Sequence, residues 1–314
     1  MRAWALVVLL FASVPAARAA SFNRAARGTA GAAFLKLRPG ARPIALGEAY
    51  AAMADDAEAI YWNPAALTRI LSRSAAFTHA SHLNGSFSEY GACGMYLGGG
   101  SSLGAGFQYF SAGSMIETDD AGIERGSFTP SDLALSFAYA YKLRLPDFPV
   151  VHRGALGVGV KYIRSSVVDT AQTAAVDIGL LSRVYGDQLR LAFTATNIGG
   201  SLKFEEEGSA LPAALRFGGT YRMHENWLAA LDVELPRDNG PVLGLGTEYA
   251  WEVEKGWLLA GRVGLNTRTL DEVDGLSGLS LGFGSDYRRT GFDYAFLPFG
   301  DLGASHRLTF SYLW

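Results

Sequence analysis

Long segments of alternating hydrophobicity recur along this chain, and they constrain its fold more than any other feature. Between residues 133 and 143, apolar and aromatic side chains occupy every second position, with small residues and Lys142 between them. Successive side chains of a β-strand point to opposite faces, so this period of two predicts a strand with one apolar face. The same pattern recurs at 156–162, 189–193, 215–221, 243–251, 257–265 and 279–283. The chain is therefore predicted to be all-β.

The opposite faces of these segments are small or charged. They carry Lys161, Arg190, Arg216, Arg222, Asp232, Glu234, Glu248, Arg262, Asp286 and Asp293. A soluble β-sandwich also alternates apolar and polar side chains, so this pattern alone leaves that fold open.

The strands are, however, about ten residues long, whereas strands of soluble sheets usually have about five or six. Aromatic residues also lie near their ends, as in the interfacial girdles of membrane barrels. These residues are Tyr139, Tyr141, Tyr162, Tyr249, Trp251, Trp257 and Tyr287.

The last segment of the chain is an amphipathic strand that ends in an aromatic residue. One of its faces carries Leu308, Phe310, Tyr312 and Trp314, and the other carries Arg307, Thr309 and Ser311. Such an ending resembles the closing strand that bacterial outer-membrane barrels present to their assembly machinery. We therefore expect a transmembrane barrel in contact with outer-membrane lipid, and the assembly machinery as a partner of the C-terminal strand.

The strand count agrees with a closed barrel. We predict fourteen strands, at 74–83, 88–98, 101–113, 131–143, 154–168, 173–184, 188–199, 212–223, 227–237, 240–253, 256–267, 275–287, 290–299 and 304–314. Single-chain barrels of the bacterial outer membrane have an even number of antiparallel strands. The longer connections at 114–130 and 200–211 are expected to be surface loops or inserts.

The first residues of the chain are typical of a secretory signal peptide. Arg2 provides the positive start, residues 3–14 form an apolar stretch, and Ala17-Arg18-Ala19 is a small-x-small cleavage site. The apolar stretch is shorter than the roughly 20 residues that a membrane-spanning helix needs. Residues 1–19 are therefore predicted to be removed on export.

A helix-like segment between residues 40 and 67 precedes the strands. Ile44, Leu46, Tyr50 and Met53 form an apolar stripe of roughly helical spacing. Acidic residues lie on another side of this segment, namely Glu48, Asp55, Asp56 and Glu58. Pro64 would end the helix, and Asn63 before it would favour an extended or turn conformation.

The sequence offers no pattern typical of an enzyme, a metal site or a nucleic-acid-binding protein. The five histidines are scattered, and the single cysteine, Cys93, permits neither a disulfide within the chain nor a cysteine metal cage. Nucleophile elbows and phosphate-binding loops are also missing. The net charge of -3 gives no basic stripe for nucleic acid. We predict a protein without catalytic activity, cofactor or bound metal, and we interpret Asp55, Asp56 and residues 205–207 as solvated or structural carboxylates.

Several sequence blocks resemble the PorV/PorQ family of outer-membrane proteins, which are distant relatives of the FadL long-chain fatty-acid transporters. The blocks are Gly40-Ala41-Arg42, Leu46-Gly47-Glu48-Ala49-Tyr50, Ala54-Asp55-Asp56-Ala57, Tyr61-Trp62-Asn63-Pro64-Ala65-Ala66-Leu67, Thr196-Asn197-Ile198-Gly199-Gly200, Leu211-Pro212-Ala213-Ala214-Leu215-Arg216-Phe217-Gly218, residues 293–303 and His306-Arg307. They occur in order over the whole mature chain. The chain departs from the family pattern at Glu48 and Ala66, where glycine is common.

This resemblance implies a fourteen-stranded barrel, residues 71–314, whose N-terminal segment, residues 20–70, folds into the lumen as a plug or hatch. A surface cap is the alternative position for that segment. The candidate hatch residues are Glu48, Tyr50, Asp55, Asp56, Trp62, Asn63, Pro64 and Ala65. The candidate lumen charges are Lys161, Arg190, Arg216, Asp232, Glu248 and Arg262.

Two functions follow from the resemblance, both in the bacterial outer membrane. In the first, the protein resembles PorV in binding or shuttling secreted proteins together with components of a type IX secretion system. In the second, it resembles FadL in passing hydrophobic small molecules, with residues 63–67 as the gate. The fold does not decide between them, because fold and site are separable.

Overall fold

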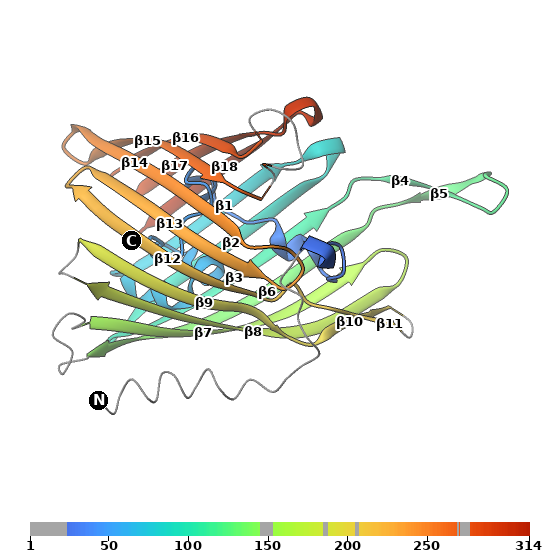
Figure 1. The fold of residues 1–314 in the computed structure, drawn as a ribbon, viewed down its shortest axis with the longest axis horizontal. Coiled ribbons are helices and arrows are strands. Elements are labelled where there is room, and N and C mark those ends of the chain that lie inside the picture. The colour runs from blue at the N-terminus through green and yellow to red at the C-terminus, as the bar shows by residue number, and fades with distance from the viewer. Residues whose placement is uncertain (1–23, 145–152, 185–187, 205–206, 269, 271–276) are drawn as a thin grey trace.

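In the computed structural model, the described residues form one closed antiparallel β-barrel (Figure 1). They comprise residues 24–144, 153–184, 188–204, 207–268, 270 and 277–314. The predicted signal peptide and its cleavage site lie outside these residues. Around the barrel, the strands follow the order β1-β18-β17-β16-β15-β14-β13-β12-β9-β8-β7-β6-β3-β2, so the first and last strands pair and close the sheet.

All fourteen predicted strands are confirmed, with ends that shift by a few residues. The barrel strands are β1 (Arg73–Ser81), β2 (Phe87–Gly98), β3 (Ser101–Ser111), β6 (Ser131–Arg144), β7 (Arg153–Ser166), β8 (Thr170–Val184), β9 (Leu189–Gly199), β12 (Ala214–His224), β13 (Trp227–Pro236), β14 (Val242–Glu254), β15 (Trp257–Asn266), β16 (Leu279–Tyr287), β17 (Thr290–Pro298) and β18 (Ala304–Leu313). Closure pairs both edges of every strand. A barrel in lipid needs this pairing because hydrocarbon offers the backbone no hydrogen bonds.

The two faces of each strand separate as the alternation predicted. On β7, Val158 and Val160 point outward with 42% and 52% of their surface exposed. Lys161, the residue after Val160, points into the lumen and is buried. Cys93 is exposed on the outer wall, so it is one of the small outward-facing residues. Aromatic side chains form a girdle near the end of the barrel that carries the C-terminus. They include Tyr139, Tyr141, Tyr221, Trp227, Tyr249, Trp251, Tyr287, Tyr312 and Trp314.

Both ends of the barrel sequence lie at one end of the molecule, because Arg73 and Trp314 exchange backbone hydrogen bonds of 3.0 and 3.1 Å. We call this the terminal end. Two of the predicted inserts form extra hairpins at the other end, β4 (Met115–Thr118) with β5 (Glu124–Phe128), and β10 (Ser201–Phe204) with β11 (Glu207–Ala210). The β4–β5 hairpin projects well beyond the barrel wall (Figure 1).

Most of the N-terminal segment lies inside the barrel, whereas residues 24–29 are exposed apart from Ala26. It does not form the continuous amphipathic helix that the spacing over residues 40–67 suggested. Its helical parts are η1 (Arg24–Ala26), η2 (Ala33–Lys36), α2 (Ala41–Ala45), α3 (Ala59–Trp62) and η3 (Pro64–Arg69). Two further short helices, η4 (Leu83–Gly85) and η5 (Gly300–Leu302), lie in loops. Among the described helices, none has the length and apolarity of a membrane-spanning helix.

The helical spacing of the apolar residues predicted the wrong local structure, because the segment has no solvent-facing side. Ile44, Leu46, Tyr50 and Met53 are at most 1% exposed, and so are most of the alanines between them. Side chains of the barrel wall bind backbone groups of this segment that a helix would otherwise satisfy internally. Asp232, for example, accepts hydrogen bonds from the backbone N–H of Tyr50 and of Ala51, at 3.1 and 3.0 Å.

Candidate functional site

The N-terminal segment spans the lumen from wall to wall. At one side, α2 packs against β15, β16, β17 and β18, and at the other, η3 packs against β6, β7 and β8. Glycines of the wall allow this close approach. A Cβ atom built at Gly264 would lie 2.0 Å from the backbone nitrogen of Gly47, a distance that real contacts do not reach. The backbone of the segment therefore rests directly on the backbone of the wall.

Asn63 organises the turn between α3 and η3, and its backbone is extended before Pro64, as the sequence predicted. It is fully buried, and its side-chain oxygen accepts a hydrogen bond of 3.0 Å from the N–H of Ala65. Its Nδ2 donates to the carbonyl of Ala51 at 2.9 Å and to that of Leu180, on β8, at 3.2 Å. Pro64 follows as the first residue of η3, where its fixed φ suits a helical start. Asn63 thus ties the segment both to itself and to the wall.

Replacing Asn63 with alanine is expected to destabilise the folded barrel by about 2–5 kcal/mol. The replacement leaves the buried carbonyl of Ala51 and the N–H of Ala65 without their partners, and each such loss costs about 1–3 kcal/mol. The measurement is heat-modifiable migration, in which the folded and the unfolded protein run as separate gel bands. The value compared is the temperature at which the folded band converts to the unfolded band, called the gel conversion temperature below. Asn226→Ala, in an exposed turn, serves as the control and should leave this temperature unchanged. Equal conversion temperatures for Asn63→Ala and wild type would contradict this role.

Charged side chains from the segment and the wall form a cluster at the centre of the lumen. Arg38 pairs with both Glu48 and Glu234, and Arg216 pairs with Glu234. Arg216 also approaches Asp232 at 3.4 Å between Nη1 and Oδ2. The predicted lumen charges Arg216 and Asp232 are therefore brought together. Because buried ion pairs repay their desolvation only when each partner is present, removal of any one member would leave an uncompensated charge.

A second cluster connects α2 to the neighbouring wall. Arg42 donates from Nε and Nη2 to both carboxylate oxygens of Glu248, each at 2.8 Å, and from Nη1 to Asp55 at 2.9 Å. Arg262 donates to Glu248 at 2.6 Å and to Asp293 at 2.5 Å. The bidentate geometry between Arg42 and Glu248 gives directional as well as electrostatic attachment. The predicted residues Asp55, Glu248 and Arg262 thus share one cluster.

Glu48 adopts a backbone conformation that favours glycine. Its φ is +68°, in the left-handed region that non-glycine residues rarely adopt. Its carboxylate pairs with Arg38 and lies 3.3 Å from Nη2 of Arg268. Burial by itself would raise the pKa of this carboxyl, but Arg38 and Arg268 lower it below its usual value. The ion pairs offset the backbone cost of a side chain at this position.

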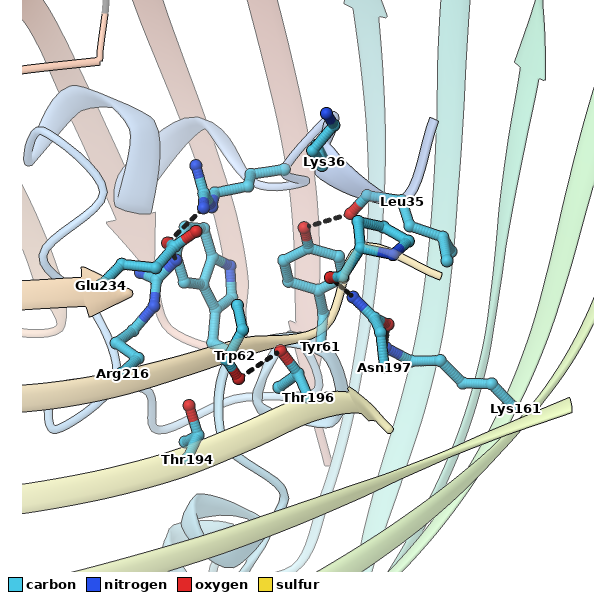
Figure 2. Close-up of a pocket in the computed structure, with 13 residues that line it drawn as sticks. Leu35, Lys36, Tyr61, Trp62, Lys161, Thr194, Thr196, Asn197, Arg216 and Glu234 are labelled. Atoms are coloured by element: carbon cyan, nitrogen blue, oxygen red, sulfur yellow. Dashed lines mark hydrogen bonds and ion pairs between the residues drawn. The ribbon is translucent and has the colours of Figure 1, made fainter. Parts of the chain in front are cut away.

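A small cavity of about 40 Å³ remains beside the central cluster (Figure 2). Tyr61 and Trp62 face it from α3, while Lys161, Arg216 and Glu234 face it from the wall. The Tyr61 hydroxyl donates to the carbonyl of Leu35 at 2.8 Å, and the guanidinium of Arg216 lies 5.0 Å from the centre of the Trp62 ring. A volume of this size holds water molecules and excludes a larger ligand.

Two of the predicted lumen charges, Lys161 and Arg190, lie apart from these clusters. Lys161 pairs with Asp177 at 2.8 Å and so belongs to the wall between β7 and β8. Arg190 lies nearer the terminal end. The predictions missed Arg38, and Arg42 entered them only through the family blocks. No spacing rule connects either residue to carboxylates about 200 residues away.

Two carboxylates of the segment carry raised pKa values. Glu58 is 1% exposed, and one of its oxygens accepts a 3.2 Å hydrogen bond from the hydroxyl of Thr78. Burial, and next the neighbouring Asp56, raise the pKa of Glu58. Burial and Asp55 raise the pKa of Asp56 to about 7. The folded state therefore binds protons at these groups at a pH where the unfolded chain has released them.

This difference predicts a fall in the stability of the protein between about pH 4 and pH 7. In that window the unfolded chain has already ionised at Asp56, and folding must restore the proton, so stability decreases as pH rises. We expect Asp56→Asn to raise stability at pH 7.5 by about 1 kcal/mol or more, since one pKa unit corresponds to about 1.4 kcal/mol. The gel conversion temperature of the variant should also vary less between pH 5 and pH 7 than that of wild type. Parallel curves for both proteins would contradict the prediction.

Comparisons with known proteins agree with this geometry. The family described as the type IX secretion system protein PorV matches residues 20–237. The Ralstonia pickettii toluene transporter TbuX has a similar fold, with a TM-score of 0.56 and 13% identity, over 88% of this chain and 98% of that chain. The Pseudomonas putida toluene transporter TodX gives a TM-score of 0.54 and 12% identity, over the same shares of the two chains. A Pseudomonas aeruginosa FadL homologue gives a TM-score of 0.52 and 10% identity, over 84% of this chain and 95% of that chain.

The structural similarities establish a fold shared with outer-membrane transporters, and at these identities they establish the fold alone. No curated protein sequence matches the chain. The family match covers more than two thirds of the chain and includes the whole segment inside the lumen. The chain is therefore a bacterial outer-membrane β-barrel that belongs to the family of the type IX secretion system protein PorV.

Proposed function

We propose that this protein is a closed barrel that binds secreted proteins, or components of a type IX secretion system, at the end opposite the terminal end. The observation that carries the proposal is the projecting β4–β5 hairpin. Met115, Ile116 and Ile123 on this hairpin are 43%, 62% and 60% exposed. The hairpin projects beyond the barrel wall, so these side chains face water (Figure 1). Apolar side chains that project into water on an extended hairpin are available for contact with another molecule.

The hairpin lies on the outer side of the membrane in this proposal. Outer-membrane barrels have short turns on the periplasmic side and longer loops outside the cell. The terminal end has two-residue turns at 99–100, 225–226, 255–256 and 288–289, and both hairpins extend from the other end. A partner would therefore meet the hairpin at the cell surface.

The packed lumen supports binding over conduction. The N-terminal segment touches opposite walls, two charged clusters join it to the strands, and the cavity beside the central cluster is about 40 Å³. A route through this lumen would require several buried ion pairs to separate, each at a cost of several kcal/mol. We accordingly assign residues 20–70 as a plug and propose no catalytic role.

The test compares two variants of the tagged protein in its native membrane. Ile116→Ser with Ile123→Ser removes the apolar surface of the hairpin. Val167→Ser with Val168→Ser removes two exposed valines from another loop at the same end and serves as the control. We expect crosslinking to recover secreted proteins with wild type and with the control, but not with the hairpin variant. In a strain that lacks the gene for this protein, the hairpin variant should support less secretion than wild type or the control. Equal recovery and secretion with all three proteins would refute the proposal.

A second candidate function is passage of hydrophobic small molecules, which the toluene transporters of similar fold perform. A cavity of about 460 Å³ favours it, since Phe34, Leu37, Leu83, Phe110 and Phe299 contribute to its lining at the end opposite the terminal end. Uptake of radiolabelled toluene by cells with and without the protein distinguishes the two functions. Faster uptake with the protein, together with unchanged secretion in the deletion strain, would establish transport.

A further inference from the structure

The outer wall of the barrel has an apolar hollow of about 590 Å³ that extends over β2, β3, β6 and β7. Its centre is a row of in-register outward positions, namely Cys93, Ala105, Phe137 and Val160. Cys93 and Ala105 are small and lie side by side on β2 and β3. Larger side chains surround these two residues, and Phe137 is 60% exposed beside them. The hollow is therefore a depression between large apolar side chains.

The hollow has the size of a binding site and faces membrane lipid. Its volume lies within the range of about 300–1,000 Å³ that is typical of small-molecule sites. An acyl chain on a flat wall touches protein on one side, whereas a chain in this hollow touches side chains on several sides. Dispersion attraction grows with the number of such contacts. A lipid chain would therefore stay longer in the hollow than elsewhere on the wall.

A second row of outward positions, nearer the terminal end, sets the depth of the hollow in the membrane. It runs from Arg73 on β1 to Tyr139 on β6. Tyr139 and Trp314 line the hollow and belong to the aromatic girdle, and such girdles lie at the level of the lipid headgroups. The row that contains Cys93 is two residues further along each strand, so it lies about 5–7 Å deeper in the membrane.

Arg73 places a cation at the rim of the hollow. Its side chain is exposed, and its guanidinium has no ion pair or hydrogen bond among the described residues. It is the one charged side chain in the described lining. On the neighbouring strands at this end, residues 71–75, 93–103 and 137–144 include no Asp or Glu. The rim is therefore complementary to an anion at the depth of the headgroups.

We infer that the hollow binds one phospholipid, with its phosphate at Arg73 and an acyl chain over Cys93 and Ala105. Arginine binds phosphate through two parallel hydrogen bonds, which fixes the headgroup at the rim. The apolar side chains below Arg73 then receive the chain that is attached to this headgroup. The site lies on the membrane face of the barrel, so it depends neither on the β4–β5 hairpin nor on the lumen and goes beyond the function proposed above.

Native mass spectrometry of the purified full-length protein in detergent tests this inference. The probe is phosphatidylglycerol, and the reference lipid is a diacylglycerol with the same acyl chains, which lacks the phosphate. Arg73→Gln removes the cation at the rim. Arg289→Gln removes the same charge from an exposed turn at the terminal end and is the control.

A second pair of variants tests the apolar part of the site. Ala105→Phe fills the hollow, and Ala229→Phe adds the same side chain on β13, outside the described lining. Cys93 is the only cysteine of the chain. Its rate of reaction with a maleimide therefore reports whether the hollow is occupied.

Wild type and both controls should bind one phosphatidylglycerol with equal affinity, and the bound lipid should slow the labelling of Cys93. Arg73→Gln should bind this lipid at least about tenfold more weakly, since one charged hydrogen bond contributes about 1.4 kcal/mol or more. It should bind diacylglycerol as wild type does. Ala105→Phe should lose the bound lipid, and it provides the comparison with Ala229→Phe if Arg73→Gln does not fold.

Equal affinity of Arg73→Gln and Arg289→Gln for phosphatidylglycerol would overturn the inference. Equal binding of phosphatidylglycerol and diacylglycerol to wild type would also overturn it, and so would equal binding by Ala105→Phe and Ala229→Phe. Lipid A that displaces phosphatidylglycerol at equal concentration would assign the hollow to that lipid instead.

Discussion

Removal of residues 20–67, with the signal peptide retained, should convert the closed barrel into an open channel. The N-terminal segment fills the space between β15–β18 and β6–β8, and its two charged clusters hold it there. Without it, water would hydrate the wall charges, since Lys161, Glu234 and Arg262 point into the lumen. The wall itself should persist, because the backbone hydrogen bonds of a barrel run between neighbouring strands. Planar bilayer recordings should show stepwise conductance for the shortened protein where the full-length protein gives none at the same amount.

A deletion outside the lumen provides the control for this experiment. Removal of residues 115–127 takes away most of the β4–β5 hairpin, which leaves the barrel wall complete. That protein should remain closed in the same recordings. Both shortened proteins should still show heat-modifiable migration, which reports the folded barrel. A shortened barrel that folds but conducts no better than wild type would show that residues 20–67 do not close it.

The second large effect is expected for Gly157→Val, which forces a side chain between the wall and the Asn63 turn. A Cβ atom at Gly157 would lie 2.2 Å from the backbone nitrogen of Ala65 and 2.3 Å from the carbonyl carbon of Pro64. Backbone atoms cannot rotate away as a flexible side chain would, so the whole turn must shift. Overpacking of this kind costs about 1–3 kcal/mol and sometimes more. We expect a lower gel conversion temperature and faster protease cleavage within residues 40–67.

Gly219→Val is the matched control, because Gly219 lies on the outward series of β12. The nearest atom to its added Cβ would be Cδ2 of Leu191, at an ordinary contact distance of 3.7 Å. A valine there adds apolar surface on the lipid side and suits a strand. This variant should keep the conversion temperature and protease resistance of wild type. If Gly157→Val behaves in the same way, the turn does not rest against β7 as the structure describes.

The barrel could be predicted from sequence because each strand is a local pattern that closure repeats. Lipid on one side and the polar lumen on the other impose a period of two on all the barrel strands, β6 and β7 among them. The number of strands and the two faces of each strand could therefore be predicted. Asn63 and Pro64 were readable as a turn for the same reason, since the chemistry of a turn residue acts over a few neighbours.

The contacts within the lumen could not be predicted in this way. The pairing of Arg42 with Glu248 joins residues separated by 206 positions, and nothing local relates them. The helical spacing over residues 40–67 predicted an amphipathic helix, but enclosure on all sides removed the solvent-facing surface that such a pattern requires. Strand register decides that Arg144, Arg153, Arg183 and Arg190 form one row.

By itself, the sequence determined that the chain forms a closed antiparallel barrel with fourteen amphipathic strands and a polar lumen, because alternation and turn chemistry act over a few residues. Only the tertiary structure decided how the N-terminal segment fills that lumen and which charges pair there. Those features depend on distances between residues that lie far apart in the chain, and strand register and close backbone packing set these distances.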